Sequence, residues 1–290
     1  MLHQPIGADE SQRNAAARAF IVGSPKTMLI GGQWTSAASG ETFDVIDPSN
    51  GKFLSAVAQG DAADVDRAVQ AATKAFEATS WAKMPPHERA RLLYRLGDVL
   101  EQNAEELATL QSYDMGLLYP FSQGMTVAMA DVFRYYAGWT TKILGSTFPA
   151  NGPGLTYTKR EPLGVVGAII PWNGPILASA WKIAPALACG NTVVLKPAEQ
   201  APLVPLRLAE LFQGAGLPDG VLNIVTGDGS TGAAMVAHPG IAKISFTGST
   251  ETGKRIIAEG AATMKKVTVE LGGKSPTIIF PDADLDKAVG

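Results

Sequence analysis

Residues 163–196 read LGVVGAIIPWNGPILASAWKIAPALACGNTVVLK, and this stretch decides the fold class. An apolar run over 165–170 opens it, and a second apolar run over 192–195 lies at its end. A helical segment near 175–189 separates the two runs. Short strands that are apolar throughout and alternate with helices indicate a parallel sheet covered by helices on both faces.

The same alternation continues toward the carboxyl end of the chain. Further apolar runs and helical segments follow one another at 202–215, 221–225, 230–238, 243–246, 251–262 and 267–271. We therefore predict the α/β class, with a doubly wound, Rossmann-like parallel sheet. Ligands on such sheets bind at the carboxyl ends of the strands, where the strand order reverses.

The residues before this sheet have a different pattern of apolar and turn residues. Residues 28–60 hold short apolar runs interrupted by turn residues, which predicts antiparallel strands and hairpins. We interpret residues 1–24 as a poorly ordered, flexible lead-in. A helical block follows the hairpins, with starts expected at Asp61 or Asp64, at Pro85-Pro86 and near residue 122.

The last residues predict a further unit. After the Gly272-Gly273 break, residues 277–280 indicate one more strand, and a helix is expected to begin at 285–289. The strand has no obvious later partner, so we expect it to be exposed and prone to aggregation.

The composition narrows the class of protein. Lys and Arg number 24 against 27 Asp and Glu, a formal charge of −3, so no basic excess is available to neutralise nucleic-acid phosphates. The longest apolar stretch, 163–170, is far shorter than the roughly 20 residues of a membrane-spanning helix, so we expect a soluble protein. One cysteine, Cys189, excludes a disulfide framework and fits a reducing, cytoplasmic location. The three histidines have no metal-ligand spacing, and no metal site is expected.

Two glycine loops compete for a phosphate. The segment from Gly227 to Gly232 fits G-x-G-x-x-G, follows a strand and opens a helix, although a simple glycine-rich turn explains it as well. The segment from Gly248 to Lys254 fits the P-loop pattern up to Arg255, where a Ser or Thr would be needed to hold magnesium. Nucleoside triphosphate hydrolysis is therefore not expected. The helix N-terminus after Gly248 can still bind a pyrophosphate.

Polar residues at strand ends form a second set of candidates. Asn173 follows the first strand of the sheet with a free amide, and Lys196 and Glu199 follow the next strand. Glu270 is an acid in an apolar strand end, where a carboxylate is costly unless it is used or paired. Cys189 ends an apolar helix, and we interpret it as a buried, inert cysteine.

These motifs together resemble one family. The chain is similar to the NAD(P)-dependent aldehyde dehydrogenase superfamily over residues 28–290. The specific marks are Arg160-Glu-Pro-Leu-Gly-Val-Val-Gly167, Pro171-Trp172-Asn173, Gly190-Asn-Thr-Val-Val-Leu-Lys196-Pro-Ala-Glu199, Phe246-Thr-Gly-Ser-Thr250 and Glu270-Leu-Gly-Gly-Lys-Ser-Pro276.

The resemblance implies roles for the matching residues. Asn173 would donate a hydrogen bond to the aldehyde oxygen, and Glu270 would be the general base. Lys196 and Glu199 would bind the adenosine ribose hydroxyls. Gly248 and Ser249 would lie under the pyrophosphate, which favours the second glycine loop over the first. The expected cofactor-binding set is completed by Ile169, Pro171, Trp172, Gly229 near the adenosine end, and Gly253.

The resemblance also implies a reaction: oxidation of an aldehyde to a carboxylic acid with NAD or NADP through a thioester. An acid facing the ribose would repel a 2′-phosphate, so Glu199 favours NAD. Glu270 favours hydrolytic release over transfer of the acyl group to coenzyme A. Gly174 stands where many members carry an aromatic residue, so pocket size does not identify the aldehyde.

The family's catalytic cysteine lies farther downstream than the 20 residues that follow Glu270, and none of these is Cys. Cys189 falls in a cofactor-domain motif and cannot take that role. We therefore expect the front part of an enzyme, inactive by itself. The alternative is a short homologue that binds NAD without catalysis or docks to a full-length relative.

The resemblance divides the chain into domains. Residues 25–270 would form the NAD(P)-binding domain, with an oligomerisation-type segment near 141–160, and residues 271–290 would begin an incomplete catalytic domain. Family members form homo-oligomers, but the C-terminal assembly strand is not part of this sequence.

Overall fold

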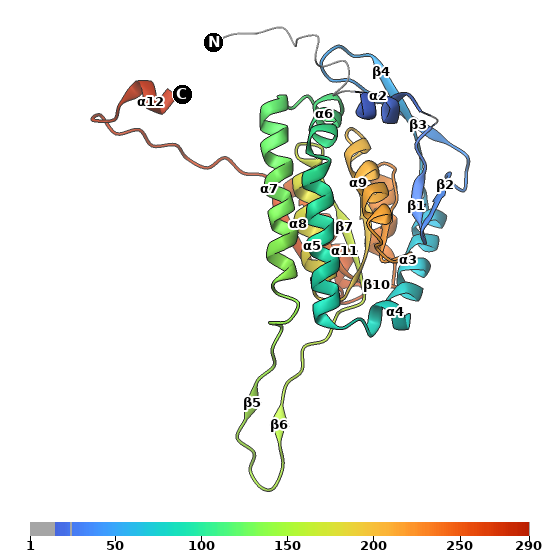
Figure 1. Cartoon of the computed structure of the whole chain (residues 1–290), viewed down its shortest axis with the longest axis vertical. Helices are drawn as coiled ribbons and strands as arrows, with labels where there is room; N and C mark the ends of the chain where they lie inside the picture. The colour runs from blue at the N-terminus through green and yellow to red at the C-terminus, as the bar shows by residue number, and fades with distance from the viewer. Residues whose placement is uncertain (1–14, 24, 290) are drawn as a thin grey trace.

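A seven-stranded sheet forms the centre of the computed structural model, which describes residues 15–23 and 25–289 (Figure 1). The strand order is β11-β10-β7-β8-β9-β1-β2. Its five parallel strands are β7 (Val165–Ile169), β8 (Thr192–Lys196), β9 (Leu222–Ile224), β10 (Ile241–Gly248) and β11 (Lys266–Leu271). This arrangement confirms the predicted doubly wound α/β fold.

The first hairpin extends this sheet and makes it mixed. Strand β1 (Met28–Ile30) pairs antiparallel with both β9 and β2 (Gln33–Thr35). The hairpin turns at Gly31 and Gly32, whose φ angles of 60° and 82° suit a two-residue turn with φ above zero at both positions. A second hairpin, β3 (Thr42–Ile46) and β4 (Phe53–Ala58), forms a separate sheet.

Helices cover both faces of the sheet. One face packs against α8 (Pro175–Ala188) and α9 (Leu203–Gly214), and the other against α3 (Ala62–Glu77), α10 (Gly229–Ala237) and α11 (Thr250–Ala261). Every residue of β7 and β8 is buried, as expected for strands covered on both sides. An outer layer over α8 and α9 contains α5 (Pro86–Gln102), α6 (Ala104–Met115) and α7 (Tyr119–Ala137), and the short α4 (Thr79–Ala82) leads into it.

Local signals explain several helix boundaries. Asp61 caps α3 by accepting hydrogen bonds from the backbone N–H groups of Ala63 and Asp64, while the Asp64 side chain bonds back to the Asp61 N–H. Pro86 opens α5 as predicted. Helix α6 was missed by the sequence analysis because it is buried around most of its circumference, so it shows no polar stripe at helical spacing.

Two expectations for the ends of the chain need correction. Residues 15–22, which the sequence analysis placed in the poorly ordered lead-in, form helix α2 (Ala15–Val22), with Ala17 and Ile21 buried in the core. Residues 1–14 and 24 of that lead-in lie outside the described residues. The strand expected at 277–280 is also wrong: this segment has no regular structure, because no strand of the described part lies beside it to supply hydrogen bonds.

Two segments extend away from the sheet (Figure 1). Strands β5 (Thr147–Phe148) and β6 (Thr156–Tyr157) pair as a long two-stranded arm. The other segment runs from the end of β11 to α12 (Leu285–Val289), the helix that the sequence predicted there. Within residues 15–23 and 25–289, no helix combines the length and apolar character needed to cross a membrane.

Candidate functional site

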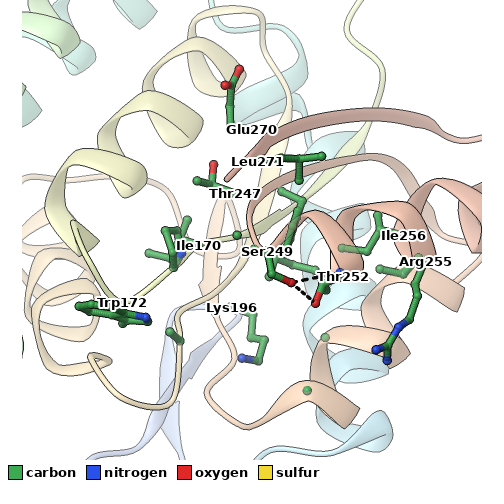
Figure 2. Close-up of a pocket in the computed structure, with 18 of the residues that line it drawn as sticks. Ile170, Trp172, Lys196, Thr247, Ser249, Thr252, Arg255, Ile256, Glu270 and Leu271 are labelled. Atoms are coloured by element: carbon green, nitrogen blue, oxygen red, sulfur yellow. Dashed lines mark hydrogen bonds between the residues drawn. The ribbon is translucent and has the colours of Figure 1, made fainter. Parts of the chain in front are cut away.

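The topology creates one crevice at the carboxyl ends of the parallel strands. β7 and β10 are neighbours in the sheet. The chain leaves β7 for α8 on one face and leaves β10 for α11 on the other. The strand order therefore reverses between β7 and β10, which is where open α/β sheets bind ligands. A cavity of about 720 Å³ lies at this place (Figure 2).

The cavity brings together all but one of the site residues expected from the sequence. It is lined by Ile169, Pro171, Trp172, Asn173, Lys196, Glu199, Gly229, Gly248, Ser249 and Glu270. The exception is Gly253, which is buried in α11 outside the cavity lining. A Cβ atom at Gly253 would come within 2.4 Å of the Leu271 side chain, so this glycine allows α11 to pack closely on the end of β11.

The N-terminus of α11 faces the cavity with an uncharged cap. The Ser249 hydroxyl accepts a hydrogen bond from the Thr252 N–H at 3.1 Å and lies 2.9 Å from the Thr252 hydroxyl (Figure 2). Other N–H groups in the first turn of a helix have no partner within that helix, and the helix dipole favours an anion there. The second glycine loop therefore has the geometry of a phosphate site.

The literal G-x-G-x-x-G loop is less suited to a phosphate because a carboxylate occupies its helix end. Asp228 caps α10, accepting hydrogen bonds from the Ser230 N–H at 2.8 Å and the Ser230 hydroxyl at 2.6 Å. These bonds hold the pKa of Asp228 below its usual value, so a phosphate at this end would meet a negative charge. No sequence motif marks Asp228 as a site residue, although it lines the cavity and directly precedes the helix.

Lys196 and Glu199 form a paired donor and acceptor on another wall. Lys196 is 4% exposed, and its ammonium donates to the Pro197 carbonyl at 2.9 Å and lies 3.5 Å from the Glu199 carboxylate. Burial lowers the pKa of Lys196, while the charges of Glu199 and Asp228 act in the opposite direction. A donor and an acceptor fixed side by side suit a sugar diol, whose hydroxyls both donate and accept.

Asn173 and Glu270 lie at the carboxyl ends of β7 and β11, the two strands on either side of β10 in the sheet. Asn173 is exposed in the loop between β7 and α8, so its amide is free for a ligand. Glu270 pairs in register with Thr247 of β10. Glu270 is exposed on the face of β11 that α11 does not cover, so its carboxylate is not buried in an apolar environment.

A buried lysine near Glu270 is a residue that sequence reasoning missed. Lys182 of α8 is 8% exposed, and its ammonium donates to the Ser245 hydroxyl at 3.1 Å. Burial lowers the pKa of Lys182 to about 8, with the charge of Glu270 acting to raise it and that of Lys243 to lower it. Ser245 pairs with Thr268, two residues before Glu270 on the same strand. No motif marks this lysine, since it lies within an otherwise apolar helix.

A second cavity of about 680 Å³ adjoins the first and shares Trp172, Glu199, Gln200 and Asp228 with it. Its wall includes Asp114, which is 2% exposed and accepts hydrogen bonds from the Leu203 and Val204 N–H groups at 2.9 and 3.1 Å. Burial raises the pKa of Asp114 to about 8, against which the two backbone hydrogen bonds act. The carboxyl group is therefore largely protonated at neutral pH.

Cys189 lies near the amino ends of the parallel strands, whereas the cavity lies at their carboxyl ends. It ends α8, two residues before Asn191, whose side-chain oxygen accepts hydrogen bonds from Leu163 and Gly164 at the amino end of β7. The expectation that Cys189 is buried is wrong: it is exposed at the helix end. This position excludes Cys189 as a nucleophile for a ligand in the cavity.

The fold and the crevice together define a class of protein. A parallel α/β sheet whose switch point carries a free helix N-terminus and a lysine–glutamate pair is typical of dinucleotide-binding proteins. The family model "Aldehyde dehydrogenase family" matches residues 34–290. The chain therefore belongs to the aldehyde dehydrogenase family.

Individual relatives agree with this assignment. The chain is 52% identical over 267 residues to aldehyde dehydrogenase family 2 member B4 of Arabidopsis thaliana, covering 90% of this chain and 49% of the relative. It is 51% identical over 272 residues to phenylacetaldehyde dehydrogenase of Pseudomonas fluorescens, covering 91% and 54%. An NAD+ complex of aldehyde dehydrogenase from Bacillus cereus superposes with a TM-score of 0.91 at 46% identity, over 99% of this chain and 57% of that structure. The chain spans about half the length of these relatives.

Proposed function

We propose that this chain supplies the dinucleotide site and two reacting-centre residues of an enzyme that oxidises an aldehyde to a carboxylic acid. The observation that carries the proposal is that one cavity is lined by both candidate reacting-centre residues and the candidate cofactor-binding residues. The former are Asn173 and Glu270, and the latter are the helix cap Ser249 and the pair Lys196 and Glu199. These residues come from four strand ends that are distant in sequence but adjacent in the sheet.

The residues present fit NAD+. The uncharged cap of α11 suits a pyrophosphate, and the donor–acceptor pair of Lys196 and Glu199 suits ribose hydroxyls. A Cβ atom at Gly229 would meet nothing within 4 Å, so this glycine leaves open space on the cavity side. NAD+ is favoured over NADP+ because the Glu199 carboxylate would repel a 2′-phosphate. NADP+ is the second candidate.

The chemistry follows from where the side chains lie. Bound NAD+ would supply the hydride acceptor. The Asn173 amide donates a hydrogen bond to the aldehyde oxygen as that oxygen gains negative charge. The Glu270 carboxylate takes a proton from the water that cleaves the thioester and releases the carboxylic acid. The Lys182 ammonium places a positive charge on the same side of the sheet as Glu270. Residues 1–290 by themselves hold no thiol at the cavity, so we expect them to bind NAD+ without turnover.

Isothermal titration of the chain with NAD+ and NADP+ tests the proposal. We expect NAD+ to bind more tightly than NADP+. We expect Glu199→Gln to reduce this difference in affinity, because it removes the negative charge facing the ribose. Glu161→Gln, the same change at an exposed carboxylate far from the cavity, is the matched control. A folded chain that binds neither nucleotide would refute the proposal.

Assembly and location are further parts of the proposal. The arm around β5 and β6 exposes Leu144, Phe148, Leu155 and Tyr157, which fits its expected use as an oligomerisation segment at 141–160. We propose a homo-oligomer, with neither nucleic acid nor membrane as a partner. A cytoplasmic location stays a prediction, since the relatives include both mitochondrial and cytosolic proteins. The division into domains at residues 270 and 271 also stays a prediction.

A further inference from the structure

One side of the cavity is a slot between two helices that the roles given above leave unused. Helix α10 contributes small and apolar side chains to it, and α11 contributes a charged rim. The slot is lined by Gly232, Ala233 and Val236 of α10 and by Thr252, Arg255, Ile256 and Glu259 of α11.

The position of the slot identifies what it would hold, provided that the proposed function is correct. The reacting end of a dinucleotide lies by Asn173 and Glu270, and its pyrophosphate lies by Ser249. The adenosine half then extends past Lys196 and Gly229 toward α10. The remaining flat, aromatic part of the ligand, the adenine ring, therefore falls in the slot. A Cβ atom at Gly232 would already be in van der Waals contact with the Lys196 side chain, at 3.7 Å, so the glycine lets a flat ring approach the backbone of α10.

Arg255 stands on the rim of this slot. It is the residue that breaks the P-loop pattern, and so far no role has been given to it. Its side chain is 67% exposed and forms an ion pair with Glu251, one helical turn earlier. Figure 2 shows Arg255 on α11, on the opposite side of the cavity from Trp172 and well away from Glu270. The guanidinium is thus far from the reacting end of the site.

We propose that the guanidinium of Arg255 stacks on the outer face of the adenine ring and closes the slot. A guanidinium is planar and permanently charged, and it stacks on aromatic faces in a way that a lysine ammonium does not. Glu251 holds the side chain along the helix, while Ile256 and Val236 are buried beneath as an apolar floor. Arg255 is thus a binding residue for the adenine end and leaves the nicotinamide end unaffected.

Titrations with the two halves of the dinucleotide test this assignment. The full chain is titrated with NAD+, AMP and nicotinamide mononucleotide, as wild type and as Arg255→Ala. We expect Arg255→Ala to weaken NAD+ and AMP equally, by about two- to fivefold, the effect of an exposed cation over an aromatic ring. Nicotinamide mononucleotide, which lacks the adenine, should bind as it does to the wild type.

Two further variants separate stacking from charge. Lys254→Ala removes the neighbouring exposed cation, which does not line the cavity, and should change none of the three affinities. Arg255→Lys keeps the charge without the planar group and should resemble Arg255→Ala; full recovery of AMP binding by this variant would overturn the stacking assignment. Unchanged AMP binding in Arg255→Ala would overturn the inference alone, with NAD+ binding by the wild type intact. A wild-type chain that binds neither NAD+ nor AMP would overturn the proposed function and this inference with it.

Discussion

The buried carboxyl group of Asp114 makes the stability of the fold depend on pH. Its pKa is raised from 3.8 to about 8, with burial as the main cause. Between these two values the folded chain holds a proton that the unfolded chain has released, so the free energy of unfolding falls as pH rises. The stability that the protonated Asp114 carboxyl contributes is fully present below about pH 4. It declines as the pH rises and is lost as the pH passes through 8.

The magnitude follows from the size of this shift. One pKa unit corresponds to about 1.4 kcal/mol, so the full difference is on the order of 5 kcal/mol, with a slope of at most about 1.4 kcal/mol per pH unit. Asp114→Asn keeps an oxygen that can accept the Leu203 and Val204 hydrogen bonds but cannot ionise. We expect the variant to match the wild type near pH 4 and to be more stable at pH 9.

Urea unfolding followed by circular dichroism between pH 4 and 9 measures the difference. Lys182, which titrates near pH 8, is present in both proteins, so its contribution cancels when the two are compared. Asp44→Asn, the same change at an exposed carboxyl that lines the same cavity, is the control and should not alter the slope. A difference in the free energy of unfolding between wild type and Asp114→Asn that stays constant from pH 4 to 9 would show that the Asp114 carboxyl does not ionise with a raised pKa.

Three other predictions concern the site and its support. In aldehyde turnover by the complete enzyme that we propose, Asn173→Ala lowers kcat by about 10²- to 10³-fold, because one oxyanion donor is lost; an unchanged kcat would disprove its role. Lys182 loses its charge near pH 8, so the plot of kcat against pH for the wild type has an inflection near pH 8. Because the ammonium acts on Glu270, Lys182→Met removes this inflection, and an inflection that persists in the variant would contradict this role. Gly253→Ala pushes a Cβ into Leu271 and lowers the free energy of unfolding by about 1–3 kcal/mol, measured by urea unfolding; Leu271→Ala in the same chain restores part of the loss, whereas additive losses would contradict the packing contact.

The sequence predicted most of the sheet because its signals are local. Runs such as 165–170 and 192–195 are apolar throughout, and only burial on both faces explains them. Helix α6 lacked the corresponding signal, since it is buried around most of its circumference. The strand expected at 277–280 failed for the opposite reason: the local pattern was present, but a strand also needs a neighbour.

The site was predictable wherever polar residues directly follow strands. Asn173, Lys196 and Glu270 follow or end strands, and the topology of the sheet brings them to one cavity. Lys182 and Asp114 lie within helices, and only the packing of those helices gives them their neighbours and their shifted pKa values. The G-x-G-x-x-G pattern was ambiguous from sequence, because nothing in the pattern shows that Asp228 turns its carboxylate onto the helix end.

A crystal structure of this chain with NAD+ would show whether the cavity at the switch point binds a dinucleotide on the cap of α11. We expect a phosphate within hydrogen-bond distance of the Ser249 hydroxyl or the first N–H groups of α11, with the ribose hydroxyls on Lys196 and Glu199. A phosphate held by the 227–232 loop, or NAD+ bound outside the cavity, would contradict this expectation.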